Sequence, residues 1–174
     1  LQPFLVIATQ NPAGASGTQL LPDSQLDRFM VKLSLGYPSA ADETELLRRK
    51  QSGNPLSQVE RVATLEELEA MRAAVDRVYL SDAVCEYIVR LIGATREHPL
   101  IVQGASPRAT LAVAAMSRAA AFVRGRDYVT PDDVRLVFAD TISHRLLLSP
   151  RGESGEVGSP VEAILKGVQP PAIQ

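Results

Sequence analysis

Residues 4–12, FLVIATQNP, and residues 21–29, LPDSQLDRF, decide the fold that this sequence predicts. The first stretch opens with an unbroken apolar run, which is typical of a strand buried on both faces of a parallel sheet. The run gives way to the polar Asn11. In open α/β sheets, ligands bind just beyond the carboxyl ends of the strands. We therefore predict a strand over residues 4–9 and a catalytic or nucleotide-sensing group at Asn11.

The second stretch predicts a short helix over residues 23–29, with Asp23 or Ser24 as its cap and Arg28 near its end. Apolar and polar side chains alternate in the segment that follows, as they do in a half-exposed strand. The further strands that we predict are residues 30–35, and residues 78–80 paired with residues 145–148.

The rest of the chain is predicted to be helical. A helix over residues 41–50 is capped by Ser39, and a polar linker follows it, so we place a domain boundary within residues 36–61. Later helices begin at capping signals, and these lie at Thr64, Ser81, Ser106, Thr130 and Ser159. The apolar residues predicted to face the core are Val84, Ile88, Leu91, Ile92, Val134, Val137 and Phe138.

Two arginines occupy positions where a guanidinium group could meet an anion. Arg28 lies on the short predicted helix, and it could equally pair with Asp27 or face solvent. Arg108 follows Ser106-Pro107, so it falls in the first turn of a helix. A cation there opposes the helix dipole, at a cost of about 0.3–1 kcal/mol. A phosphate group or a nearby carboxylate would each compensate for that cost.

Composition narrows the classes of protein. The chain has 174 residues, a net charge of −2 and a pI near 5.7, which argues against binding nucleic acid through phosphate neutralisation. The single Cys excludes an internal disulfide and fits a reducing compartment. The sequence has no signal peptide and no apolar run near 18 residues. We expect a cytoplasmic location, without membrane insertion.

The order and spacing of several motifs resemble those of the MoxR family of AAA+ ATPases. These motifs are ATQNP, LPDSQLDRF, GASPRA at the start of a helix, and GRDYVTPDDV, and the resemblance covers nearly the whole chain. It implies that Asn11 is the sensor 1 residue, Arg28 an arginine finger acting in trans, and Arg108 the sensor 2 residue. Residues 13–16 depart from the family, in which an acidic, Glu-containing loop is more usual. That departure lies in a loop and leaves the three assignments intact.

The resemblance implies a mainly α fold: a helical AAA+ lid preceded by a remnant of an α/β P-loop NTPase core. Residues 1–36 would be the remnant, residues 37–62 a connecting helix and linker, and residues 63–174 the lid. The lid has its own core and should be well ordered. The two strands expected in residues 1–36 would lack their natural neighbours, and we expect this segment to be frayed, rearranged or paired with another copy.

The sequence has no Walker A motif, GxxxxGK[ST], and its only Asp-Glu pair, Asp42-Glu43, begins a helix instead of ending an apolar strand. We therefore expect this chain to be the C-terminal part of a longer protein, inactive alone and without bound cofactor. No metal site is predicted, since His98 and His144 lack ligand spacing.

The intact protein, by resemblance, would be an ATPase that uses ATP and Mg²⁺ and self-associates into a ring, with six subunits as the expected number. Its role would be chaperone-like or in metal-cofactor insertion, on a client protein that the sequence does not identify. Two alternatives stay open. One is a protein similar to the ATPase subunit of magnesium chelatase. The other is a non-enzymatic helical interaction module whose Arg108 binds a partner's carboxylate.

Overall fold

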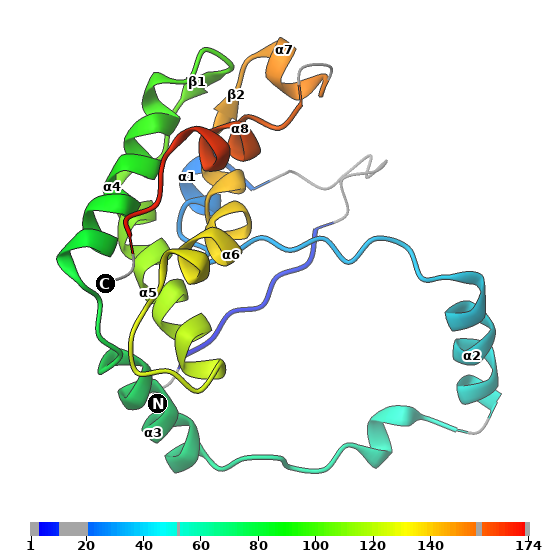
Figure 1. The fold of residues 1–174 in the computed structure, drawn as a ribbon. Coiled ribbons are helices and arrows are strands. Elements are labelled where there is room, and N and C mark those ends of the chain that lie inside the picture. The colour runs from blue at the N-terminus through cyan, green and yellow to red at the C-terminus, as the bar shows by residue number, and fades with distance from the viewer. Residues whose placement is uncertain (1–3, 11–20, 52, 156–157, 173–174) are drawn as a thin grey trace.

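The computed structural model describes residues 4–10, 21–51, 53–155 and 158–172. Helices dominate these residues, and the strands are short (Figure 1). In chain order the elements are α1 (Asp23–Leu26), α2 (Ala40–Gln51), η1 (Pro55–Gln58), α3 (Leu65–Asp76), α4 (Asp82–Glu97), β1 (Ile101–Gln103), α5 (Pro107–Val123), α6 (Pro131–Ile142), η2 (Ser143–Arg145), β2 (Leu147–Leu148), α7 (Pro150–Glu153) and α8 (Pro160–Gly167).

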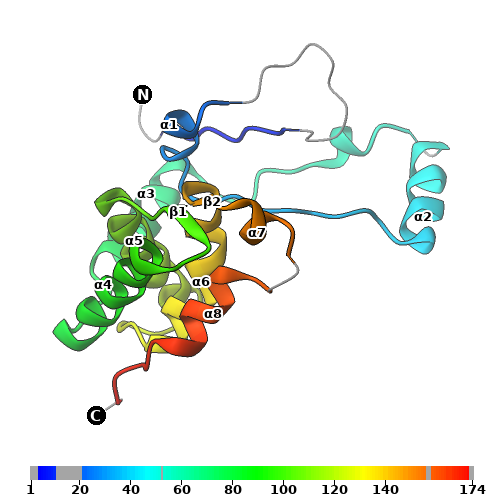
Figure 2. The same cartoon turned by 90° about the horizontal axis from the view of Figure 1, so that it is seen from above.

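Helices α4, α5, α6 and α8 form a bundle around the hydrophobic core of the described residues, and α3 packs against α5 without burying a side chain. Helix α5 packs along α6, and α4 lies against both (Figure 1). All seven residues predicted to face the core are buried. Helix α2, like α3, buries no side chain, but it lies apart from the bundle in both views (Figure 2). The core therefore belongs to the region predicted as the lid.

Local capping chemistry starts these helices largely where the sequence predicts. The Thr64 hydroxyl accepts the Glu67 N–H at 3.1 Å, and the Thr64 N–H donates to the Glu67 carboxylate at 2.7 Å. This reciprocal pair is the predicted capping box. Ser81 caps α4, and Ser39 bonds the N–H of Asp42 near the start of α2. Each cap satisfies an N–H that the helix itself leaves unpaired.

A fully buried carboxylate fixes the turn between α5 and α6. Asp133 accepts hydrogen bonds from Arg124 at 3.0 Å and from Arg126, and also from the Thr130 N–H and hydroxyl, each at 2.9 Å. Gly125 precedes this turn with φ +72°, a conformation that favours glycine. The charged cluster closes the end of the core at which α6 begins.

The strands predicted at residues 4–9 and 30–35 are not formed. Phe4 and Ile7 are each 84% exposed, and residues 4–10 have no strand partner among the described residues. Lys32 donates its N–H to Asp140 of α6 at 3.0 Å instead of joining a sheet. A buried parallel strand needs partners on either side, and the described residues supply none. The short helix also differs: it begins after Pro22 and ends at Leu26.

The one sheet of the described residues pairs β1 with β2 in antiparallel fashion. The prediction that residues 78–80 would pair with residues 145–148 is wrong in its first partner, because Ile101 lies opposite Leu148. Tyr79 instead forms an isolated bridge with Tyr128. No helix in the described part of the chain is both long enough and apolar enough to cross a bilayer.

Candidate functional site

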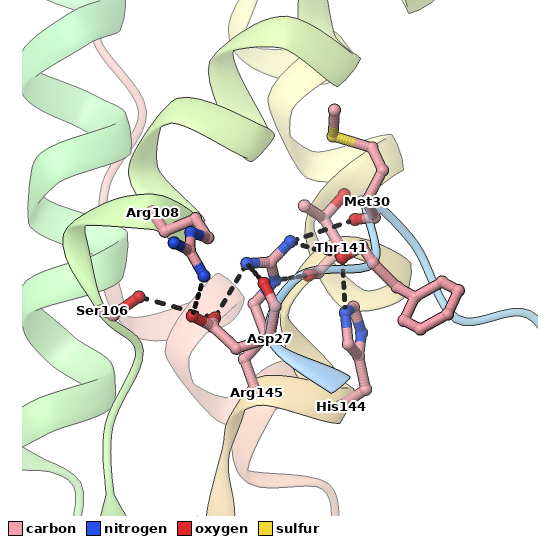
Figure 3. A network of polar contacts seen from close by, with 8 residues as sticks. Asp27, Met30, Ser106, Arg108, Thr141, His144 and Arg145 are labelled. Atoms are coloured by element: carbon pink, nitrogen blue, oxygen red, sulfur yellow. Dashed lines mark hydrogen bonds and ion pairs between the residues drawn. The ribbon is translucent and has the colours of Figure 1, made fainter. Parts of the chain in front are cut away.

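Asp27 lies where three separate parts of the chain meet. It follows α1, and its carboxylate is placed between the start of α5 and the segment η2 (Figure 3). The carboxylate accepts hydrogen bonds from Arg145 at 2.9 Å, from Arg108 at 3.4 Å and, at a long 3.5 Å, from the Ser106 hydroxyl. We call these four residues the Asp27 cluster.

Arg145 is the buried cation of the Asp27 cluster, with a side chain only 2% exposed. Its Nε donates to the carbonyl of Thr141 at 2.9 Å, which orients the guanidinium group. Its two terminal nitrogens donate to the carbonyls of Asp27 and Phe29, each at 2.7 Å. A buried guanidinium is tolerated when its donors are paired in this way.

His144 makes a second contact to the same turn. Its Nε2 lies 3.1 Å from the carbonyl of Phe29, and because a carbonyl only accepts, we assign the proton to Nε2. Burial lowers the pKa of His144 below its usual value, and the neighbouring Arg145 guanidinium lowers it further. This contact joins residues 115 positions apart, and no local pattern predicts it.

Arg28 sits on the turn that Arg145 and His144 hold. Its side chain is exposed, and it forms no ion pair with the described residues. The alternative of an Arg28–Asp27 pair is not what the structure has, since Asp27 pairs with Arg108 and Arg145. Arg28 and Ser24 line an open groove beside residues 4–6. The arginine-finger role stays a prediction, and it is compatible with this exposure.

Arg108 lies in the first turn of α5, as predicted, and Asp27 is the anion that compensates it. The pair spans 3.4 Å, and the Arg108 side chain is 56% exposed. Ser106 precedes the helix but makes no capping bond, because its hydroxyl is directed at Asp27. The alternative of a nearby acidic residue is therefore realised. The sensor 2 role stays a prediction.

The end of α4 positions the start of α5. The Thr95 hydroxyl accepts the Ala105 N–H at 3.0 Å, and Arg96 Nε donates to the Ala105 carbonyl at 2.9 Å. Gly104 lies so close that a Cβ there would be 2.7 Å from the Cα of Arg96. Glycine is required at that approach. The loop before Arg108 is thus held by hydrogen bonds at Ala105 and by close backbone packing at Gly104.

The remaining predictions on the site fall outside these contacts. Asn11, the sensor 1 candidate, lies outside the described residues. Among the described residues no group of three or more His, Cys, Asp or Glu could hold a metal ion. Sequence reasoning missed Asp27 and Arg145 as partners. No local signal in the sequence marks this pair, because its contact joins residues 118 positions apart.

Comparisons with known proteins agree with the helical architecture. Residues 93–164 match the model of the AAA lid domain, and residues 1–31 match the model of the ATPase family associated with various cellular activities. A solved structure of a protein from Cytophaga hutchinsonii, assigned as an ATPase, superposes with a TM-score of 0.88 at 35% identity. That likeness covers 98% of this chain and 55% of the other.

Curated relatives are similar over most of the chain. The uncharacterized protein YeaC of Bacillus subtilis is 39% identical over 166 residues, which cover 95% of this chain and 51% of YeaC. Chaperone MoxR1 of Mycobacterium tuberculosis is 38% identical, over 84% of this chain and 41% of its own length. Protein MoxR of Paracoccus denitrificans is 28% identical, over 85% of this chain and 49% of its own length. The chain spans about half the length of the curated relatives it matches.

Proposed function

Because this chain belongs to the MoxR family of AAA+ ATPases, we propose that it carries the sensing and lid parts of an ATP-driven ring protein. In the proposal, Arg108 faces the nucleotide of its own subunit, and Arg28 faces the nucleotide of the neighbouring subunit. Asn11 serves as sensor 1. The work of the ring is chaperone-like, in the cytoplasm, with metal-cofactor insertion as one form of it.

The observation that carries the proposal is that the Asp27 carboxylate joins two segments that are distant in the sequence. Asp27 belongs to the Arg28 turn, and its carboxylate accepts a hydrogen bond from Arg108 at the start of α5, 81 positions away. A guanidinium that meets a phosphate at α5 would therefore change the partners of the residue next to Arg28. This arrangement gives the lid a direct physical link to the group proposed to act on the next subunit.

The donors at the start of α5 fit a phosphate group. Arg108 lies at the N-terminus of a 17-residue helix, where the dipole and the guanidinium both favour an anion. An exposed ion pair such as Arg108–Asp27 contributes about 1 kcal/mol or less, so Arg108 can exchange Asp27 for a phosphate at little cost. Bound ATP with Mg²⁺ would supply the transferable phosphoryl group and part of its charge neutralisation.

The chain alone, residues 1–174, is expected to show no ATP turnover. The reason is that its sequence has no Walker A motif to cradle phosphates, so we propose that another part of the intact protein supplies it. Phosphate release in the presence of ATP and Mg²⁺ would be measured for the purified chain and for the intact protein. ATP hydrolysis that copurifies with residues 1–174 would contradict the proposal that another part of the intact protein supplies the phosphate-binding motif.

In the intact protein, Arg108→Ala is expected to weaken ATP binding by roughly 10- to 100-fold, the loss expected for one charge-assisted hydrogen bond. Arg151→Ala is a matched control, because Ser149-Pro150-Arg151 repeats the Ser-Pro-Arg start of α5 at the start of α7. Equilibrium titration with a fluorescent ATP analogue measures both. Equal affinities for wild type and Arg108→Ala would favour the interaction module, in which Arg108 binds a partner's carboxylate.

A further inference from the structure

The position of Arg28 is set by backbone contacts to one distant side chain. Arg145 donates to the carbonyl of Asp27 and to the carbonyl of Phe29, each at 2.7 Å, and these are the carbonyls on either side of Arg28 (Figure 3). A third bond joins the same guanidinium to the Asp27 carboxylate at 2.9 Å. The planar guanidinium thus spans the turn from one end to the other.

Apart from the Arg108–Asp27 pair and the long Ser106–Asp27 bond to the start of α5, few polar contacts among the described residues hold the turn. Helix α1 has four residues and buries none of them, and a helix that short is not stable by itself. His144 adds one bond to the Phe29 carbonyl, and the Lys32 N–H adds one to the Asp140 carbonyl of α6. The partners Arg145, His144 and Asp140 lie on α6 or on η2, which directly follows it.

Arg145 is in turn fixed to the bundle. Its Nε bonds the Thr141 carbonyl in the last turn of α6, and its side chain is 2% exposed. A displacement of the end of α6 therefore moves Arg145 and, through two carbonyls, the backbone of Arg28. We infer that Arg145 is the positioning residue for Arg28: it transmits the position of the lid to the turn that presents the proposed arginine finger. The inference rests on the proposed function only for what Arg28 does.

Amide exchange of the chain itself tests the positioning without any nucleotide. The N–H groups of Asp27, Arg28 and Phe29 are hydrogen-bonded within the turn, so their exchange reports its opening. In Arg145→Lys, a single ammonium group cannot span both carbonyls, and we expect these three amides to exchange about tenfold faster or more. Protection of the α5 core, at Val113 for example, should stay at the wild-type level.

Arg135→Lys is the matched control. Arg135 lies on α6 and donates to the carbonyl of Leu165 at 2.7 Å, so it ties α6 to α8 and does not touch the Arg28 turn. Its variant should leave the exchange of residues 27–29 unchanged. If Arg145→Lys fails to reach wild-type helical content, Arg145→Gln, neutral and close in shape, takes its place. Unchanged exchange at residues 27–29, or equal acceleration across α5, would overturn the positioning role.

Turnover by the intact protein tests the consequence separately. A displacement of about 1 Å can cost roughly 100-fold in rate, so Arg145→Lys should lower kcat by about 10- to 100-fold with little change in the KM for ATP. Adding Arg145→Lys to Arg28→Ala should cause no fall below the kcat of Arg28→Ala alone, because Arg145 is inferred to act only through Arg28. If Arg145→Lys speeds amide exchange at residues 27–29 without lowering kcat, Arg145 positions the turn but Arg28 is not an arginine finger. An additive further fall in the double variant would reject the idea that Arg145 acts through Arg28.

Discussion

Alanine at position 28 is expected to remove most ATP turnover of the intact protein, by about a thousandfold or more in kcat, and to leave ATP binding unchanged. Phosphoryl transfer spreads negative charge over the transferred oxygens, and a guanidinium from a neighbouring subunit stabilises that charge in the transition state. Arg28 suits this use because its side chain is exposed and free of ion pairs to the described residues. Steady-state turnover and equilibrium ATP binding separate the two effects.

Mixing variants tests whether Arg28 acts across an interface. Arg28→Ala subunits keep an intact nucleotide site, and subunits damaged in the P-loop keep Arg28, so a mixed ring should regain part of the activity. Arg72→Ala, at an exposed position on α3, is the control and should turn over ATP like the wild type. Full activity of Arg28→Ala together with no rescue in mixtures would leave Arg28 as a solvated surface residue.

Asp133→Asn is expected to lower the free energy of unfolding by about 3 kcal/mol. Removing one partner from a buried ion pair costs about 3–5 kcal/mol. The lower end applies here because Arg126 and Arg124 are 24% and 44% exposed, so both can turn toward water. Urea unfolding of the chain followed by circular dichroism measures the loss. Asp132→Asn, at the exposed neighbouring position, is the matched control and should change stability by less than about 0.5 kcal/mol.

The same carboxylate predicts a pH dependence. Burial raises the pKa of Asp133, but the bonds from Arg126 and Thr130 outweigh it and lower the pKa from 3.8 to about 2. A depressed folded-state pKa contributes stability that is present above the unfolded value and lost as the pH falls from about 4 through 2. The contribution is roughly 2 kcal/mol. It should be absent from Asp133→Asn, and an identical acid-unfolding profile for the variant would assign the acid sensitivity to other groups.

The helices were predictable because their signals are local. The Thr64–Glu67 capping box, the Ser81 cap and the Thr130-Pro131 start each lie within one turn of the helix that they begin. The apolar face of α4 likewise follows from spacing along one segment. These features need no information from the rest of the chain.

The strands were not predictable in this way. An apolar run such as residues 4–9 becomes a buried strand only when other strands lie on both sides of it, and the described residues provide none. The β1–β2 pair was missed for a related reason, since Ile101 and Leu148 are joined by contacts that neither segment specifies alone. Pairing depends on the partner, and a single segment does not name it.

In the candidate site, too, local features were predictable and long-range contacts were not. The need of Arg108 for an anion followed from its place in the first turn of a helix, and the structure supplies one in Asp27. The identity of that anion did not follow, nor did the bonds of Arg145 to residues more than 110 positions away. Contacts of that range are fixed by the packing of the bundle, after the helices have formed.

Arg145 holds Phe29 by its carbonyl and not by its ring, and every amino acid supplies a carbonyl. Substitution of Phe29 or Met30 therefore leaves the acceptors in place, so a mutational scan would report these two positions as tolerant of change. Sequence drift at these positions can proceed while the geometry around Arg28 is kept. The constraint on these two carbonyl positions lies in Arg145, outside the turn, and a scan restricted to residues 29 and 30 would not detect it.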